Sequence, residues 1–420
     1  MEYFPKFDNT PHFFYICPQP IGENGLLMNY KITIKFLLIA SCLAIADTTY
    51  TQRIKNASFL HPFFEKLIQF ENTKEGKINV LHIGDSHVWS PAFSKAIRQS
   101  LQKQFGNGGR GFIFPYSLEK NSNRPITFTS NVPWQNCRNN APLKCEPGTE
   151  FGMAGYGFST DSDKFVLAIE IDDVQEQFNT IKIVSTATPP IFRLATVDSV
   201  DTSTFRTLEY QRQEQFVSVY NQSKPVSKIY LLPAQKQVRY NLNGIILEND
   251  APGVVYHNIG TLGSQAQHFN ATPLFFKQLP VLSPDLVIIS FGTNEAFGEV
   301  PVKKFIAQID LLMQNIRKTC PNASILVTTP PTSLLKRGKL NQRSLEYSTG
   351  LMQRSDISLW DLYSFTGGLE GAKNPKAIQI TSDNVHYTAQ GYTGQGTSLI
   401  KALLNEYEYY KQNHKITGAK

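Results

Sequence analysis

A short apolar run that leads straight into a serine constrains this chain more than any other feature. Residues 78–83 predict a buried strand, and residues 84–87, which read GDSH, follow it directly. In open α/β sheets, ligands bind in the crevice outside the carboxyl ends of the strands. Ser90 is a good N-cap and Pro91 suits the first position of a helix. The pattern therefore predicts a strand, a tight turn that presents Ser86, and a helix, which is the local geometry of a serine hydrolase.

A base for this serine is expected near the end of the sequence. Asp383 and His386 stand three residues apart in the run SDNVHYT. That spacing lets the carboxylate reach the imidazole within one turn of chain, where it would hold the neutral tautomer and stabilise the imidazolium as it forms. Ser86, His386 and Asp383 are therefore the candidate catalytic residues.

Two further segments offer donors for an oxyanion. The apolar run 285–291 predicts a central parallel strand and ends at GTNE, which places Asn294 at a strand end as Ser86 is. A second strand, near residues 254–259, ends in a glycine-bearing loop where a backbone N–H can approach a ligand closely. We expect the oxyanion hole to combine the N–H groups of Ser86 and Gly263 with the side-chain amide of Asn294.

These segments, in this order, resemble the SGNH hydrolases of the GDSL esterase superfamily. The resemblance covers roughly residues 75–115 and 252–410. Five motifs point more narrowly to the bacterial peptidoglycan O-acetylesterases, which remove acetyl groups from O6 of muramic acid. These motifs are GDSH at 84–87, GRGF at 109–112, GTNEAFG at 292–298, WDLYSFTGG at 360–368 and VHYTAQGY at 385–392.

The resemblance implies a role for each matched residue. Ser86, Asp383 and His386 take the positions of the triad, and Gly263 and Asn294 those of the oxyanion hole. No cofactor and no metal is implied. Three residues near these positions are expected to contact substrate, with pairing to a carboxylate as the alternative for the arginine: His87, Arg110 and Glu295.

The hydropathy pattern predicts an α/β fold. Apolar runs indicate further strands at 324–328 and 357–362, and helical periodicity indicates helices at 302–319, 340–354 and 388–410. The expected fold is a three-layer α/β/α sandwich with a parallel sheet of about five strands, the flavodoxin-like arrangement of the SGNH hydrolases. Right-handed crossovers would bring the catalytic segments to one edge of that sheet.

The middle of the chain has a different pattern. Short alternating runs separated by polar turns predict an inserted all-β module of the sandwich type. We expect a leader at 1–46, the first part of the hydrolase domain at 47–117, the module at 118–250 and the second part of the hydrolase domain at 251–420. The peptidoglycan O-acetylesterases carry a carbohydrate-module-like insertion in the same place.

The amino-terminal region predicts export. Two lysines precede an apolar run, 36–46, within a signal peptide that begins at Met28. The run is too short to cross a bilayer, which takes ~20 residues. Ala44-Ile45-Ala46 is a cleavage site, and an overlapping lipoprotein box would instead place a lipid on Cys42. The protein is expected in the periplasm or cell envelope, with contact to a membrane only through that lipid.

Cysteine usage and charge fit that location. Cys137 and Cys145 enclose a short polar loop and can pair in an oxidising compartment, which leaves Cys320 unpaired. The formal net charge is +7, a mild basic excess suited to an anionic wall polymer. Basic runs with interleaved aromatic residues, zinc-spaced cysteines and phosphate-binding loops are missing from the sequence, which argues against nucleic acid as a partner.

The sequence therefore predicts a secreted serine esterase whose partner is O-acetylated peptidoglycan. Three other interpretations stay open. The substrate can be another O-acetylated polysaccharide, the same scaffold can transfer the acetyl group to a sugar, or the chain can be a wall-binding protein without activity.

Overall fold

The computed structural model describes residues 53–420, except for 117, 119–124, 198–204, 238 and 418–420. The expected signal peptide and the lipid site at Cys42 lie outside the described residues. Gln52–Lys420 form one compact unit. Within the described part, no helix is both long and apolar enough to cross a membrane.

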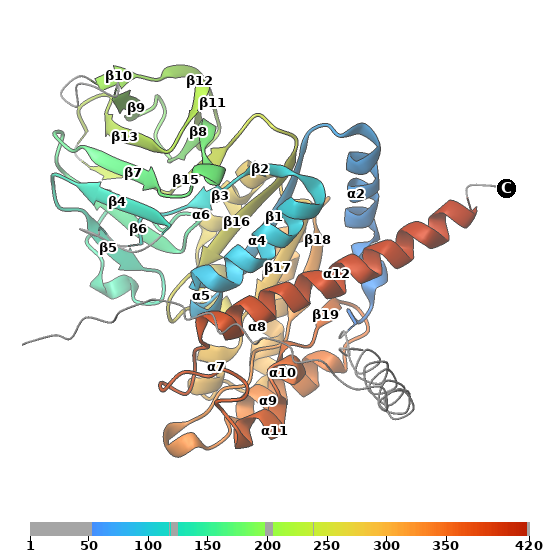
Figure 1. Cartoon of the computed structure of the whole chain (residues 1–420). Coiled ribbons are helices and arrows are strands. Elements are labelled where there is room, and N and C mark those ends of the chain that lie inside the picture. Colours follow the sequence, from blue (N-terminus) through green and yellow to red (C-terminus); the bar gives the residue numbers. More distant parts are fainter. Residues whose placement is uncertain (1–52, 117, 119–124, 198–204, 238, 418–420) are drawn as a thin grey trace, which may run out of the picture. The chain divides into compact units, whose positions relative to one another are not determined.

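A six-stranded parallel sheet forms the centre of the hydrolase part (Figure 1). The predicted strands are present, and the sheet has one strand more than expected because a short glycine-rich segment joins its edge. In order across the sheet the strands are β19 (Ser358–Trp360), β18 (Ser324–Thr328), β17 (Leu286–Ser290), β1 (Lys77–Gly84), β16 (Gly253–Gly260) and β2 (Asn107–Gly109).

Helices cover both faces of this sheet, which gives the three layers. Val80 packs into the core under one set of helices and Leu81 into the core under the other, because successive side chains of a strand point to opposite faces. The first set is α2 (His61–Thr73), α4 (Pro91–Phe105) and α12 (Ala389–Thr417). The second set is α5 (Ala266–Asn270), α6 (Pro273–Gln278), α8 (Val302–Thr319) and α9 (Gln342–Met352).

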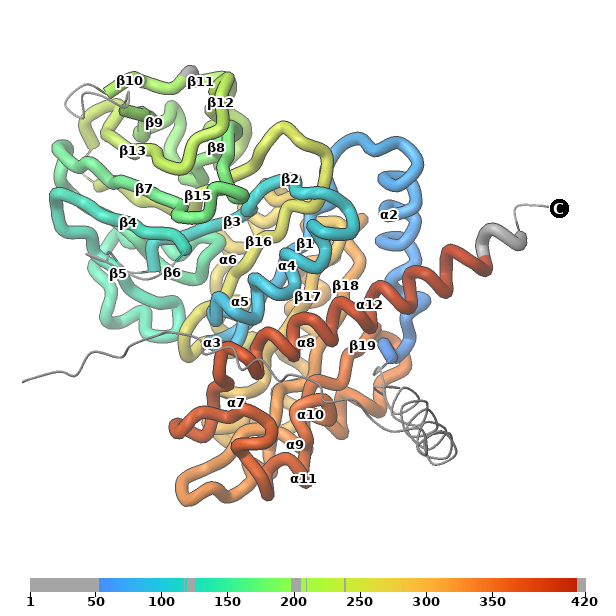
Figure 2. Tube along the Cα trace, in the orientation of Figure 1, coloured from blue at the N-terminus to red at the C-terminus, as the bar shows by residue number. Residues whose placement is uncertain are grey.

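Early and late parts of the chain meet on the first face. Helices α4 and α12 lie side by side although about 300 residues separate them (Figure 2). Four short helices stand at loops around the sheet: α3 (Ser86–Trp89), α7 (Thr293–Phe297), α10 (Leu362–Phe365) and α11 (Gly368–Lys373). Helix α4 begins at Pro91 with Ser90 as its N-cap residue, as predicted, although the Ser90 side chain accepts no capping hydrogen bond.

The described residues of the insertion are all-β, with one five-stranded antiparallel sheet, a second five-stranded antiparallel sheet that is completed by β3 from just before residue 118, and one three-stranded sheet. The first is β10 (Phe205–Thr207), β9 (Phe192–Val197), β13 (Lys228–Pro233), β7 (Leu167–Ile171) and β4 (Ile126–Ser130). The second is β11 (Glu209–Glu214), β12 (Val217–Val226), β8 (Phe178–Val184), β15 (Gly244–Glu248) and β3 (Gly111–Ile113). The third is β14 (Tyr240–Asn241), β6 (Tyr156–Thr160) and β5 (Gln135–Arg138).

The two parts share a hydrophobic core. Leu81 and Ile289 of the parallel sheet belong to the same buried cluster as Phe158 and Ile245 of the insertion. The predicted boundaries at 118 and 250 stay a prediction, because nothing in the packing separates two cores there.

Candidate active site

Three parallel strands bring the predicted site segments to one edge of the sheet. Gly84 at the end of β1 pairs with Gly260 of β16 on one side and with Ser290 of β17 on the other. The segments that follow these three strands therefore begin side by side at the carboxyl edge of the sheet. Ser86 lies two residues beyond its strand, Gly263 three and Asn294 four, so the sheet register explains why residues far apart in sequence meet.

Ser86 is the first residue of a one-turn helix, α3. The preceding residue, Asp85, caps this turn, since its Oδ1 accepts a hydrogen bond of 2.9 Å from the His87 N–H. The sequence predicts a tight turn here, and the structure shows that this turn is a short helix, which separates the serine from α4. It leaves Ser86 half-buried with its hydroxyl directed at His386.

A continuous hydrogen-bond chain joins the three candidate catalytic residues. His386 Nε2 lies 2.8 Å from Ser86 Oγ, and His386 Nδ1 lies 2.7 Å from Asp383 Oδ2. With Asp383 ionised, Nδ1 carries the ring proton and Nε2 is free to accept from the serine hydroxyl. The arrangement is that of a nucleophile, a base and a group that orients the base.

Local hydrogen bonds hold the Asp383 carboxylate in this position. Its Oδ1 accepts from the backbone N–H groups of Val385 and His386, each at 2.9 Å, and from the Thr381 hydroxyl at 2.8 Å. Partial burial opposes ionisation of Asp383, but hydrogen bonds from the backbone and ring of His386, from Val385 and from Thr381 outweigh it. They hold the pKa of Asp383 well below its ordinary value, so the residue is an anion at neutral pH.

The two segments with candidate oxyanion donors are tied to one another. Asn294 Nδ2 donates to the Ser264 carbonyl at 2.9 Å, and Gln265 Nε2 donates to the Asn294 carbonyl at 3.0 Å. Gly263 has a φ of 73°, a conformation that favours glycine, in the turn next to these contacts. The structure thus places Gly263, in the loop after β16, and Asn294, in α7, beside the end of β1.

Glu295 is a buried residue that joins the same two segments. Its Oε1 accepts from the Ala266 N–H at 2.8 Å, and its side chain is 3% exposed. Burial raises the pKa of Glu295 to about 8, with a smaller contribution from the negative charge of Asp85. Burial likewise raises the pKa of Asp85 to about 7. Glu295 therefore acts in this structure as a buried link between the two segments, and its expected contact with substrate stays a prediction.

His87 also packs inside the protein. Its Nδ1 lies 3.0 Å from the Tyr392 hydroxyl, and its ring centre lies 5.3 Å from that of His386. Burial, followed by the charge of His386, lowers the pKa of His87 to about 3, so the ring is neutral. In this structure the buried His87 side chain packs beside the base, and its expected contact with substrate stays a prediction.

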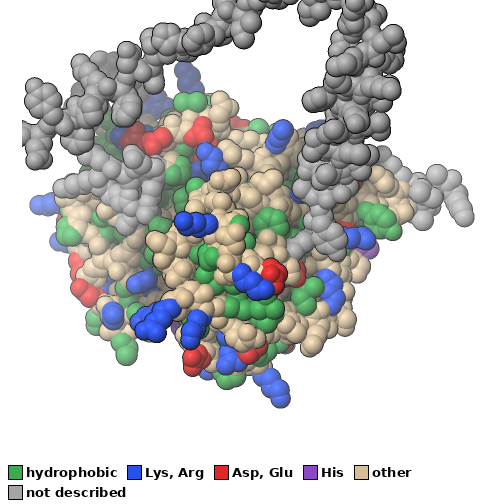
Figure 3. All heavy atoms as spheres, turned by 60° about the horizontal axis from the view of Figure 1, so that its bottom comes forward, with side chains coloured by type: hydrophobic (Ala, Val, Ile, Leu, Met, Phe, Trp, Pro, Cys, Tyr) green, Lys and Arg blue, Asp and Glu red, His purple; other side chains and the backbone are tan. Residues whose placement is uncertain are grey.

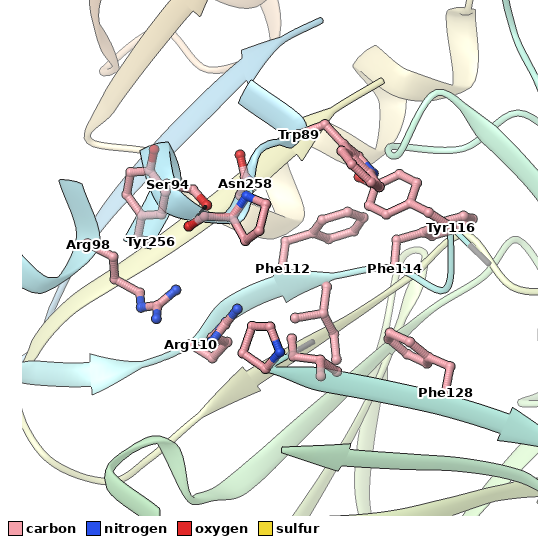
Figure 4. A pocket seen from close by; sticks show the side chains of 14 residues that line it. Trp89, Ser94, Arg98, Arg110, Phe112, Phe114, Tyr116, Phe128, Tyr256 and Asn258 are labelled. Carbon is pink, nitrogen blue, oxygen red and sulfur yellow. Dashed lines mark hydrogen bonds between the residues drawn. The ribbon is translucent and has the colours of Figure 1, made fainter. Parts of the chain in front are cut away.

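Arg110 follows the second of its two predicted alternatives. Its guanidinium pairs with the Glu176 carboxylate, which also pairs with buried Arg98. The two arginines stand at one end of a pocket of about 290 Å³ between α4 and the insertion (Figure 4). Aromatic side chains line much of the remainder: Trp89, Phe112, Phe114, Tyr116, Phe128 and Tyr256.

Several residues of the site escaped the sequence analysis. Asp85 and Tyr392 lie within motifs that the sequence singles out, but their buried contacts depend on the fold. Glu176 carries no sequence signal, since its partners are 66 and 78 residues away. Among the described residues, no group of three or more His, Cys, Asp and Glu side chains is placed to hold a metal ion.

Comparisons with known proteins bear on this arrangement. Residues 243–393 match the GDSL-like lipase/acylhydrolase family, a segment that includes Gly263, Asn294, Asp383 and His386 but not Ser86. A structure described as a peptidoglycan O-acetylesterase in action is 20% identical, with a TM-score of 0.65 over 83% of this chain and 96% of the other.

Two other solved structures cover only 36% of this chain. A putative platelet activating factor from Streptococcus pneumonia is 16% identical over 73% of its own chain, with a TM-score of 0.30. A catalytic mutant of an acetylxylan esterase from Geobacillus stearothermophilus is 15% identical over 73% of its own chain, with a TM-score of 0.29. These two are too distant to support an argument. A comparison with curated proteins finds no match.

The match of residues 243–393 to the GDSL-like lipase/acylhydrolase family, together with the similarity in fold, supports a carboxylic ester hydrolase that resembles the SGNH hydrolases. This confirms the predicted class. Over 83% of its length the chain is similar in fold to a structure described as a peptidoglycan O-acetylesterase.

Proposed function

We propose that this esterase removes O-acetyl groups from O6 of muramic acid in cell-wall peptidoglycan, with Ser86 as nucleophile. The observation that carries the proposal is the unbroken hydrogen-bond chain from Asp383 through His386 to Ser86. Serine esterases need a hydroxyl made nucleophilic by an adjacent base. Here Ser86 supplies the hydroxyl and His386 supplies the base.

The reaction follows from these positions. As Ser86 Oγ attacks the acetyl carbonyl carbon, His386 Nε2 takes the hydroxyl proton. The C–O bond to the sugar then breaks, and His386 returns the proton to the departing sugar oxygen. A water molecule, deprotonated by the same ring, attacks the acetyl carbon of the acetyl-enzyme. The bond from that carbon to Ser86 Oγ then breaks, His386 returns the proton to Oγ, and acetate leaves. Asp383 stays ionised and holds the Nδ1–H tautomer throughout.

Three donors stabilise the negative charge on the carbonyl oxygen in this proposal. They are the N–H groups of Ser86 and Gly263 and the side chain of Asn294. Asn294 uses one of its two amide hydrogens for Ser264, which fixes the direction of the other. One such donor is typically worth ~3 kcal/mol of transition-state stabilisation.

Substrate and location rest on other observations. The five sequence motifs resemble peptidoglycan O-acetylesterases, and one such enzyme shares the fold at 20% identity. The disulfide between Cys137 and Cys145 suits an exported protein, in line with the expected signal peptide. On the face that Figure 3 shows, basic side chains are interspersed with acidic and hydrophobic ones.

The first experiment measures acetate release by the purified protein from O-acetylated peptidoglycan, with acetylated xylan as the competing substrate. Ser86→Ala is expected to lower kcat by at least about 10³-fold, because it removes the nucleophile. Release from peptidoglycan that depends on Ser86 and exceeds release from xylan supports the proposal. A preference for xylan would leave the mechanism unchanged and show that the substrate is another polysaccharide. Full turnover by the Ser86→Ala variant would show that Ser86 is not the nucleophile.

A further inference from the structure

We propose that the disulfide-closed loop of the β insertion, Cys137–Cys145, positions the oxyanion loop of the hydrolase part. Three consecutive residues of the first loop, 138–140, bind two residues, Leu262 and Ser264, on either side of Gly263. This inference rests on the proposed function and makes Asn139 and Asn140 positioning residues for the esterase reaction.

One carbonyl receives two hydrogen bonds from the insertion. Arg138 Nη1 donates to the Leu262 carbonyl oxygen at 3.2 Å, and Asn140 Nδ2 donates to the same atom at 3.1 Å. The peptide bond from Leu262 to Gly263 contains this carbonyl and the Gly263 N–H. Because the peptide unit is planar, fixing the carbonyl also fixes the direction of the N–H proposed to bind the oxyanion.

Asn139 holds the other side of Gly263. Its Oδ1 accepts from the Ser264 hydroxyl at 3.0 Å, and Asn139 is 8% exposed while Ser264 is fully buried. The Ser264 carbonyl in turn accepts from Asn294 Nδ2. Asn139 therefore reaches both proposed oxyanion segments through one residue, Ser264.

Gly263 itself has no side chain by which the loop can anchor it. Its φ of 73° depends on the residues around it, and a Cβ placed on it would lie 2.9 Å from Asn140 Nδ2. The insertion thus packs directly on the residue whose N–H matters. A change at Asn140 is expected to alter the orientation of that N–H rather than the affinity for sugar.

The disulfide loop is held at its own base, so it can act as a support. The Asn139 N–H donates to the Gly155 carbonyl at 2.9 Å, and the neighbouring Ala154 carbonyl accepts from the Thr261 hydroxyl at 2.8 Å. The Cys137–Cys145 bond closes the loop across 8 residues. Support therefore comes from both the covalent bond and the contacts beneath it.

The test uses p-nitrophenyl acetate, an ester too small to contact a distant glycan surface. Asn139→Ala and Asn140→Ala are each expected to lower kcat by about tenfold with KM within about twofold, because misplaced groups weaken transition-state stabilisation. Leu143→Ala is the matched control: it lies in the same loop and is 100% exposed, so kcat should not change.

A double-mutant cycle asks whether Asn139 acts through Ser264. If it does, Asn139→Ala costs much less kcat in a Ser264→Ala background than in the unchanged protein. Fully additive losses would overturn this part of the proposal. Thermal unfolding of each variant checks that the fold is intact, and Arg138→Met, at an exposed residue, gives a second probe of the Leu262 contact should Asn139→Ala fail to fold.

Reduction of the Cys137–Cys145 disulfide gives an independent test of the proposal. Opening the Cys137–Cys145 bond with a reductant, or replacing both cysteines by serine, is expected to lower kcat while Leu143→Ala stays unaffected. Wild-type kcat in the asparagine variants and in the reduced protein would overturn the proposal. Absence of any Ser86-dependent turnover in the unchanged protein would instead mean that the proposed function has failed.

Discussion

The Ser86 turn and the Asp383–His386 loop meet at a single hydrogen bond, yet different interactions hold them in place. The serine turn is fixed by close backbone packing. A Cβ added to Gly84 would lie 2.4 Å from the Ser290 carbonyl oxygen, and one added to Gly260 would lie 2.1 Å from the Trp89 nitrogen. The strand ends around Ser86 therefore have no room for another atom.

The loop that carries the base is more open. The side chain of Asp383 is 51% exposed and that of His386 is 39% exposed. Polar bonds hold it: the Thr381 N–H donates to the His386 carbonyl at 2.8 Å, and the Leu334 N–H donates to the Asn384 carbonyl at the same distance. The comparison teaches that the nucleophile depends on packing and the base on directed hydrogen bonds. Substitutions in the loop that carries the base should therefore lower activity with little effect on stability. Substitutions in the packed turn around Ser86 should lower both.

The largest effect is expected on the exposed side, from Asp383→Asn. The amide can present an N–H₂ group to His386 Nδ1, which favours the tautomer protonated at Nε2, and that tautomer cannot accept the serine proton. A comparable change in other triads lowers kcat by about 10⁴-fold, and we expect roughly 10³ to 10⁴-fold here. Ester turnover and thermal unfolding measured together check this.

Stability should change little in this variant, because the side chain is half exposed. Glu370→Gln, at an exposed carboxylate on α11, is the control for loss of a surface charge and should leave kcat unchanged. Two outcomes would contradict this account of the loop that carries the base. One is that Asp383→Asn unfolds the protein, and the other is that the variant retains more than about a tenth of wild-type kcat.

Gly260→Ala is expected to lower turnover less than Asp383→Asn does, but to lower stability more. The added methyl group meets the backbone of α3, so either the strand or the serine turn must move. Overpacking of this kind costs typically about 1–3 kcal/mol, and displacement of Ser86 by ~1 Å lowers kcat by about 10²-fold. Urea unfolding and ester turnover report the two effects.

Gly394→Ala provides the contrast. Gly394 lies in α12 and has no atom within 4 Å of its would-be Cβ, so alanine should leave packing and turnover unchanged and favour the helix. Equal stability of the Gly260 and Gly394 variants would contradict the packing account.

The sequence predicted the parts of this site that follow from local pattern. The apolar runs locate β1, β17 and β18, and the turns after the strands locate Ser86 and Asn294. Strand β2 was missed because three residues, Asn-Gly-Gly, have no hydrophobic pattern. Helix α3 was missed because it is a single turn set by the Asp85 cap.

Long-range contacts could not be predicted. Nothing local in Asn139 or Glu176 says which loop or which arginine each will meet, because the partner is chosen by how the insertion packs on the sheet. The same holds for Glu295, which follows Asn294 in a motif and for that reason was expected to face substrate. Only the fold shows that Glu295, which lies in α7 with Asn294, turns inward toward Ala266.

The smallest effect is expected from Glu295→Gln, which tests the buried side by pH. The pKa of Glu295 is raised to about 8 in the folded protein from an ordinary value of 4.5. Between these pH values the folded state keeps a proton that the unfolded state releases, so this residue makes stability fall as pH rises. Glutamine keeps an oxygen for the Ala266 N–H and carries no titrating proton. The variant should therefore gain stability over the wild type as pH rises, by at most about 1.4 kcal/mol per unit. Asp85, with a pKa of about 7, leaves a residual slope in both proteins.

Urea unfolding from pH 5 to pH 8 measures the difference, with kcat expected within tenfold of wild type. Parallel stability curves would show that Glu295 is ionised in the fold, and the buried side would then hold a charge rather than a neutral hydrogen-bonding group.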